Sequence, residues 1–339
     1  DDTCIAKDTA LVRPSPLGVQ YVDYALWQRS TALAPHLASH RAYWRSALRE
    51  GDLPVLELPL DYPRPALQTF NGDVVGVTID ASSASRLEAA GRSVGCTLFQ
   101  CVLGVWCVVL CRHAGQEEVV VGSPYHGRDV GGTEGLIGYF VNMLALRVGM
   151  PSAASSSSSS GGGSVLVCAR DAASGGMRHA LLPFQSIVHD LLPRRSHDAS
   201  RNAVFQAMIA WGAEADARMA AGGDGNLADS TASERCDSTS GRSSASGHAT
   251  TLSLHPLLAP GRDASDGGHR VSKVEVTFFG GSDADGRISG GLEYNADLLL
   301  HRHMQTVAIS CGSIALDVTG GGKQLRSPHA GHRDCALVM

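Results

Sequence analysis

This 339-residue sequence has no excess of basic residues, no apolar run of membrane-spanning length and no paired cysteines at metal-site spacing. The formal net charge of -5 argues against a nucleic-acid footprint and against a polybasic membrane patch. The most apolar run, Leu98 to Leu110, is too short to cross a bilayer and contains Gln100. We therefore expect neither nucleic acid nor membrane as a partner.

Cysteines with metal-ligand spacing are absent, although the chain holds nine cysteines, an odd number. Cys107 and Cys111 lie four residues apart in an apolar run, so they share one face of a helix. This pattern predicts small buried thiols in a reducing compartment and no metal site. The sequence begins at Asp1 without a methionine or a signal peptide, and we expect a fragment of a cytoplasmic protein.

Aromatic residues are also scarce, at 5% of the chain, and two internal stretches are poor in large apolar side chains. Residues 151–164 are almost entirely Ser, Gly and Ala, and residues 213–270 are rich in Gly, Ser, Asp and Ala. Such segments bury too little apolar surface to offset their ordering entropy, which predicts two disordered insertions and a disordered tail over 317–339. The rest should form one lobe from three pieces, 17–150, 165–212 and 271–316, preceded by a linker remnant, 1–16.

Hydrophobic periodicity within this lobe predicts strands that alternate with helices. The predicted helices are two within 17–50 divided at Pro35, then 82–95 capped by Ser83 or Ser85, 97–112, 186–192, 202–211 and 297–309. The predicted strands are 73–80, 118–122, a β-rich stretch over 136–148, and a hairpin of 274–278 with 288–294, while the proline-rich residues 53–70 should be extended. The fold class is therefore α/β, in the form of an α+β sandwich.

Seven short motifs resemble those of non-ribosomal peptide synthetase condensation domains, and they occur in that family's order. They cover roughly 17–150, 168–211 and 271–310. The most specific is Ile137-Gly138-Tyr139-Phe140-Val141-Asn142-Met143 followed by Arg147. The others include Tyr21-Val22-Asp23-Tyr24-Ala25-Leu26-Trp27, Leu56 to Pro65, Gly115 to Arg128, His179 with Leu182-Pro183-Phe184-Gln185, Asp198 to Gln206, and Leu292 to Leu298.

The resemblance implies a chloramphenicol-acetyltransferase-like lobe beside a substrate tunnel. It also implies amide formation between thioesters that peptidyl or aminoacyl carrier domains present on phosphopantetheine, with an adenylation domain in the same synthetase and no cofactor bound directly. The family's catalytic His-His-x-x-x-Asp-Gly motif is absent, since no two histidines are adjacent in this sequence. We therefore assign no catalytic residue and expect the chain alone to be inactive.

The resemblance makes five residues candidates for the tunnel wall: Gly138, Tyr139, Asn142, Arg201 and Asn202. Each has a structural alternative from the residues themselves. Asn142 could instead close a strand, and Arg201 with Asn202 could cap and salt-bridge the start of a helix at Val204.

Other polar residues of the motifs favour structural roles. Arg128 and Arg147 should contact carboxylates or backbone carbonyls, and Asp23 should be a hydrogen-bonding group on a helix. His126 is expected to be a solvated loop residue, whereas His179 occupies a motif position but lacks the motif's polar neighbours, replaced by Ala180 and Leu181.

Two other functions remain open. The chain could be a non-catalytic module that binds carrier proteins, which predicts binding without turnover. It could also belong to another acyltransferase of the same superfamily, for epimerisation, cyclisation or ester formation. In either case, a lone lobe would expose the surface that normally packs on its other half, which predicts poor solubility.

Overall fold

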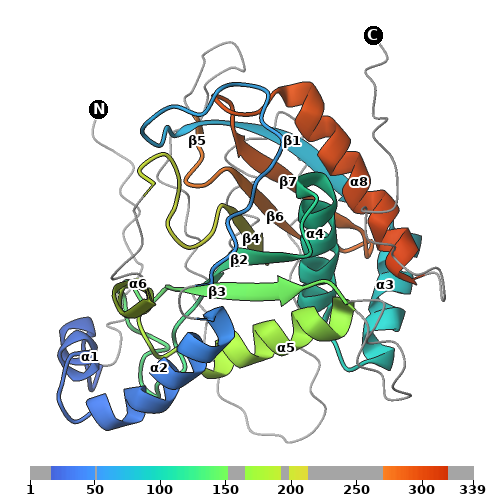
Figure 1. The fold of residues 1–339 in the computed structure, drawn as a ribbon. Coiled ribbons are helices and arrows are strands. Elements are labelled where there is room, and N and C mark those ends of the chain that lie inside the picture. Colours follow the sequence, from blue (N-terminus) through green and yellow to red (C-terminus); the bar gives the residue numbers. More distant parts are fainter. Residues whose placement is uncertain (1–16, 50–51, 152–164, 192–197, 213–269, 320–339) are drawn as a thin grey trace, which may run out of the picture.

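The computed structural model describes residues 17–49, 52–151, 165–191, 198–212 and 270–319 (Figure 1). The segment 1–16, both predicted insertions and the tail beyond 319 lie outside the described residues, apart from one or two boundary residues. The three predicted pieces of the lobe contribute strands to one sheet.

Seven strands form a mixed sheet in the order β3-β2-β4-β6-β7-β1-β5 (Figure 1). β4 pairs in parallel with β2 and with β6, and every other neighbouring pair is antiparallel. The strands are β1 (Asn71–Ile79), β2 (Glu118–Tyr125), β3 (Asn142–Gly149), β4 (Ala207–Trp211), β5 (Arg270–Val271), β6 (Val276–Ser282) and β7 (Ile288–Asn295). Together with the helices that cover it, this sheet confirms the α/β class.

The helices include one central member, α4, which contacts α3, α5 and α8 (Figure 1). They are α1 (Tyr21–Gln28), α2 (Ala34–Leu48), α3 (Ala81–Ser93), α4 (Leu98–Ala114), α5 (Val165–Arg178), α6 (Phe184–Leu191) and α8 (His301–Thr319). Pro35 stands in the first turn of α2, where its missing N–H costs no hydrogen bond, so the chain makes two helices as expected.

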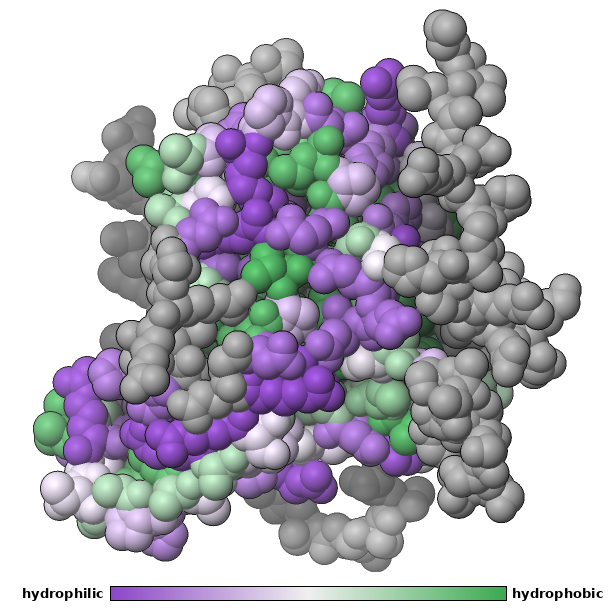
Figure 2. Space-filling view, viewed as in Figure 1, coloured by the Kyte–Doolittle hydropathy of each residue, from purple (hydrophilic) through white to green (hydrophobic). Residues whose placement is uncertain are grey.

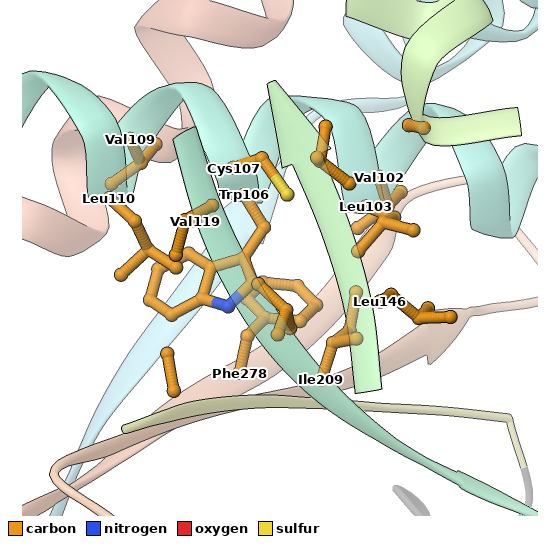
Figure 3. Close-up of a cluster of buried hydrophobic side chains, with 14 of the residues drawn as sticks. Val102, Leu103, Trp106, Cys107, Val109, Leu110, Val119, Leu146, Ile209 and Phe278 are labelled. Carbon is orange, nitrogen blue, oxygen red and sulfur yellow. The ribbon is translucent and has the colours of Figure 1, made fainter. Parts of the chain in front are cut away.

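The core forms where α4 packs on the centre of the sheet. Thr97 caps α4 together with Gln100, and a run of apolar residues from Cys101 to Cys111 is buried all round the helix. Trp106 points from α4 toward Phe278 of β6 and Ile209 of β4 (Figure 3), and its indole N–H donates to the Met208 carbonyl over 3.2 Å. The prediction of a buried helix over 97–112 is therefore confirmed.

The predicted helix over 202–211 is wrong, because residues Ala207–Trp211 form strand β4. Ala207 and Ile209 are completely buried. β4 lies between two parallel neighbours, so apolar side chains are required on both of its faces. A short apolar run of this kind has no alternation that separates a central strand from a buried helix.

Three boundaries also differ from the prediction. The cap of α3 is Asp80, whose carboxylate accepts from the Ser83 backbone N–H, and neither Ser83 nor Ser85 has that role. Only 142–149 of the β-rich stretch pairs as a strand, since 136–141 forms a loop. The closing helix is His301–Thr319 and not 297–309, so it extends into residues 317–319, which were expected to belong to a disordered tail. At its start, Asp61 of the extended 53–70 segment accepts the Leu300 N–H at 2.8 Å.

Gly175 and Gly176 lie inside α5, where glycine lowers helix stability by about 1 kcal/mol each. The structure shows what these glycines permit. A Cβ at Gly175 would lie 2.3 Å from the Tyr43 hydroxyl, and one at Gly176 would lie 2.8 Å from a Leu146 methyl group. The two glycines therefore let α5 approach α2 and β3 closely.

Replacing Gly175 by alanine is expected to lower the free energy of unfolding by about 1–3 kcal/mol, because overpacking outweighs the gain in helix propensity. Urea unfolding followed by circular dichroism measures the change. Gly312 in α8 is the matched control, since a Cβ there meets nothing within 4 Å. Gly312→Ala should be neutral or stabilising, and an equal loss in both variants would contradict the packing argument.

Candidate functional site

Four of the family-like segments lie against one another and form what we call the motif cluster: residues 21–24, 138–142, 179–184 and 201–206. α1 packs on the loop before β3, where the rings of Tyr21 and Tyr24 lie 5.1 and 4.8 Å from the Phe140 ring. The Tyr21 hydroxyl donates to the Tyr139 carbonyl at 2.9 Å. A Cβ on Gly138 would lie 2.3 Å from the Tyr21 ring, so only glycine fits this contact.

Arg128 also binds the loop before β3. Its guanidinium donates to the carbonyls of Thr133 and Leu136, at 2.6 and 2.9 Å, and lies 4.3 Å from the centre of the Phe140 ring. The expected structural role of Arg128 is confirmed. The loop leaves two large side chains in solvent, because Ile137 is 95% exposed and Tyr139 is 73% exposed.

Asn142 is the first residue of β3, and both the nitrogen and the oxygen of its side-chain amide form hydrogen bonds. The amide nitrogen donates to the carbonyls of Ala180 and Leu182, at 2.7 and 2.8 Å. The amide oxygen accepts from the N–H groups of Met143 and Phe184, at 3.0 and 2.9 Å. The three contacts with Ala180, Leu182 and Phe184 tie β3 to the turn before α6, which matches the alternative of a polar residue closing a strand. A contact with substrate stays a prediction.

The fourth segment of the cluster joins through Phe205, whose ring lies 5.6 Å from that of Phe184. Asn202 accepts from the Val204 N–H at 3.0 Å, so it stabilises the turn before β4 and does not cap a helix. Gln206 accepts from the Leu56 N–H and donates to the Asn202 carbonyl, both at 2.8 Å. Residues 53–60 are thereby fixed beside the motif cluster.

Arg201 forms ion pairs with Glu57 and with Asp198, each at 2.9 Å, while its own side chain is only 14% exposed. The salt bridges expected for Arg201 are thus present. The helix that was expected to begin at Val204 is absent, because the chain continues into strand β4. Both carboxylates are exposed, so they hold Arg201 from the solvent side. A role for Arg201 in a tunnel wall stays a prediction.

A buried carboxylate beside Arg201 was missed by the sequence analysis. Glu275, next to the start of β6, is 4% exposed and pairs with Arg64 at 2.8 Å. Burial raises the pKa of Glu275, although the Arg64 and Arg201 guanidiniums act in the opposite direction. The alternation of 274–278 gave a signal for a strand, but it did not show that the polar face is also covered.

Other family-like polar residues have structural contacts. Asp23 accepts the Gln20 N–H at 2.8 Å and completes a capping box at α1, as its predicted hydrogen-bonding role requires. Arg147 binds Glu118 at 2.6 Å and the carbonyls of Leu48 and Asp52. His126 accepts the Arg128 N–H at 3.0 Å on an exposed loop.

Within the described ranges, no group of three or more His, Cys, Asp or Glu side chains is placed to hold a metal ion. Burial raises the pKa of Cys101 and of Cys111 to about 12, so these thiols stay protonated at neutral pH. Nor is any single described helix both long and apolar enough to cross a membrane; α3 and α4 pass that test only as a pair bent by 105°.

An apolar surface patch lies beside the motif cluster, where α1 meets the loop before β3. Figure 2 shows hydrophobic residues among hydrophilic ones at this lower-left end of the molecule. α1 buries none of its residues. The patch consists of Leu17, Val19, Val22, Leu26 and Trp27 together with Ile137 and Tyr139.

The mixed sheet, its helical layer and the motif cluster together form one α/β lobe. The model of the family described as the condensation domain matches residues 11–235, which is more than half of the chain. The chain belongs to the condensation-domain family.

Curated relatives of this chain are large synthetases. Malpinin synthetase from Mortierella alpina is 38% identical over 197 residues, which cover 58% of this chain and 2% of that protein. A linear gramicidin synthase from Brevibacillus parabrevis is 36% identical over 203 residues, 60% of this chain and 2% of that protein. The chain therefore spans only a small part of the curated relatives that it matches.

Two solved structures show the fold. The X-domain from teicoplanin biosynthesis is superposed with a TM-score of 0.64 at 21% identity, covering 90% of this chain and 60% of that one. The SgcC5 protein from Streptomyces globisporus gives a TM-score of 0.59 at 19% identity, covering 91% of this chain and 61% of that one. At these identities the likeness concerns architecture alone.

Proposed function

We propose that this chain is the C-terminal lobe of a peptide synthetase condensation domain, and that the complete domain joins two carrier-bound acyl groups by an amide bond. The observation that carries the proposal is the motif cluster. Segments that are family-like in sequence and up to about 180 residues apart pack together through Tyr21, Phe140, Asn142, Phe184 and Phe205. The family match and the synthetase relatives support the same conclusion.

In the proposed reaction, the amine of an acceptor aminoacyl thioester attacks the carbonyl carbon of a donor thioester. The new C–N bond replaces the C–S bond, the donor thiol leaves, and the amine gives up one proton. A histidine suits the proton transfer because its pKa lies near neutral pH. The sequence contains no His-His-x-x-x-Asp-Gly, so we propose that these 339 residues position substrates without completing the reaction.

The proposed partners are peptidyl and aminoacyl carrier domains with phosphopantetheine arms, and an adenylation domain of the same synthetase. One structural neighbour is a four-domain nonribosomal peptide synthetase, which supports such an arrangement. The proposed location is the cytoplasm, supported by the free thiols of Cys96, Cys101, Cys107 and Cys111, which are buried and unpaired.

The test is a condensation assay with the full chain. Donor and acceptor carrier proteins, each loaded with an aminoacyl thioester, are mixed with the chain, and dipeptidyl thioester is measured by mass spectrometry. We expect no product above the protein-free control. Product formation would overturn the proposed lack of turnover. Retention of phosphopantetheinylated carrier protein on the immobilised chain, without turnover, would instead favour the alternative of a non-catalytic module that binds carrier proteins.

The exposed patch predicts self-association of the chain. Ile137→Asp combined with Leu26→Gln should increase the soluble, monomeric fraction in size-exclusion chromatography, because both side chains are mostly exposed and apolar. Ile309→Asp is the control, since Ile309 is 72% exposed on α8, outside the patch. If the wild-type chain is monomeric at high concentration, the patch does not drive association.

A further inference from the structure

An aromatic joint with two histidines connects α2 to the end of α5. The His179 ring stacks on Tyr43 with 4.1 Å between ring centres and an angle of 11° between the planes. The His40 ring meets His179 edge-on, with 5.0 Å between centres and an angle of 77°. Trp44 adds a hydrogen bond from its indole N–H to the His179 carbonyl at 3.0 Å. The joint thus consists of three residues of α2 and one residue that follows α5.

Both imidazoles have a buried Nδ1 atom without a hydrogen-bond partner among the described residues. A neutral imidazole can leave one nitrogen as an unused acceptor at modest cost. An imidazolium must carry a proton on both nitrogens, so protonation would create a buried donor without an acceptor. The joint therefore favours the neutral form of His179.

The titratable and charged groups around the joint also favour the neutral form of His179. α2 supplies His40, and α5 supplies Arg178; both disfavour a positive charge on His179. Burial, followed by these two neighbours, lowers the pKa of His179. Burial also raises the pKa of Tyr43, so the phenol stays neutral and supplies no negative charge. From α6, the Asp190 carboxylate is already paired with Arg41.

The joint is connected directly to the motif cluster. The residues that follow His179 are those whose carbonyls, at 180 and 182, accept from Asn142. Gly175 allows the close approach of Tyr43 that the ring stack needs. Separation of α2 from α5 would therefore release the 179–184 turn from α2 and leave it held by Asn142 of β3.

We propose that the His40–Tyr43–His179 joint is an acid-sensitive latch, which holds the 179–184 turn in place at neutral pH and opens when His179 is protonated. A histidine whose pKa is lowered in the closed state binds protons more readily once the joint has opened. The latch is therefore fully closed above the ordinary histidine pKa of about 6.5 and is progressively lost as the pH falls below it. This inference does not depend on the proposed function.

The first measurement is the pKa of individual histidines, from deuterium exchange at the imidazole C2 position read by mass spectrometry of the full chain. His179 should titrate below about 6.5 in the wild-type chain and move upward in His40→Gln, which removes a neighbouring imidazole that disfavours a positive charge on His179. His126→Gln, on an exposed loop, should leave His179 unchanged. An ordinary or raised pKa for His179 in the wild-type chain would overturn the proposal.

The second measurement is amide hydrogen exchange, corrected for its intrinsic pH dependence, at pH values on either side of the histidine range. Protection of α2 and of the 179–184 turn should fall at least tenfold at the lower pH, while that of α4 stays constant. His179→Gln should keep its protection at both pH values. An equal fall across the whole chain would show global acid unfolding and contradict a local latch, and this comparison needs only the wild-type chain.

Discussion

Replacing Glu275 by alanine is expected to lower the free energy of unfolding by about 3–5 kcal/mol, since it leaves a buried guanidinium without its partner. Arg64 is only 14% exposed and lies 2.8 Å from the Glu275 carboxylate. Water cannot replace the lost charge without opening the packing between the extended 53–70 segment and β6. Denaturant unfolding at neutral pH measures the loss.

Two control variants test whether the loss of stability comes from the unpaired buried charge of Arg64. Glu57→Ala removes an acid that pairs with a different arginine, Arg201. Because Glu57 is 63% exposed, we expect the free energy of unfolding to fall by only about 0–1 kcal/mol. The double change Glu275→Met with Arg64→Met removes both buried charges and should recover most of the stability. If the double variant were no more stable than Glu275→Ala, unpaired charge would not be the cause.

Asn142→Ala is the second large prediction, with an expected loss of about 2–4 kcal/mol from four hydrogen bonds of roughly 1 kcal/mol each. The carbonyls of Ala180 and Leu182 and the N–H groups of Met143 and Phe184 would all lose their partner. The damage should concentrate in the turn before α6. Hydrogen exchange of residues 179–184 locates it there, and an unchanged turn would contradict this account.

Asn142→Asp separates hydrogen bonding from side-chain size. An ionised aspartate keeps the two acceptor contacts but places an oxygen against the carbonyls of Ala180 and Leu182. It should therefore be destabilised at neutral pH and should recover, relative to the wild-type chain, as acid protonates the new carboxyl group. Asn142→Ala should show no such recovery. Identical pH profiles for the two variants would rule out the donor role of the amide.

Several elements could be predicted because their cause is local. Pro35 divides two helices, since a proline is tolerated only in a first turn. α4 is apolar on every side, which indicates burial whatever surrounds it. The motif order between Tyr21 and Leu298 identified the family without any three-dimensional contact, and the family match confirms it.

Other features depend on partners far away in the chain, and the sequence could not supply them. Residues 207–211 are a strand because β2 and β6 stand on either side, and the same apolar run alone also fits a helix. Asn142 closes a strand because the turn at 180–184 presents three backbone groups to it. Glu275 is buried because Arg64, more than 200 residues earlier, offsets its charge.

The sequence by itself therefore determined the family, the α/β class and the helices whose pattern is complete within one segment. The tertiary structure decided which polar residues hold the fold and which glycines are needed for packing. The physical reason is that periodicity, capping and proline effects act within a few residues. Desolvation, charge pairing and close approach depend on which distant groups fold into contact.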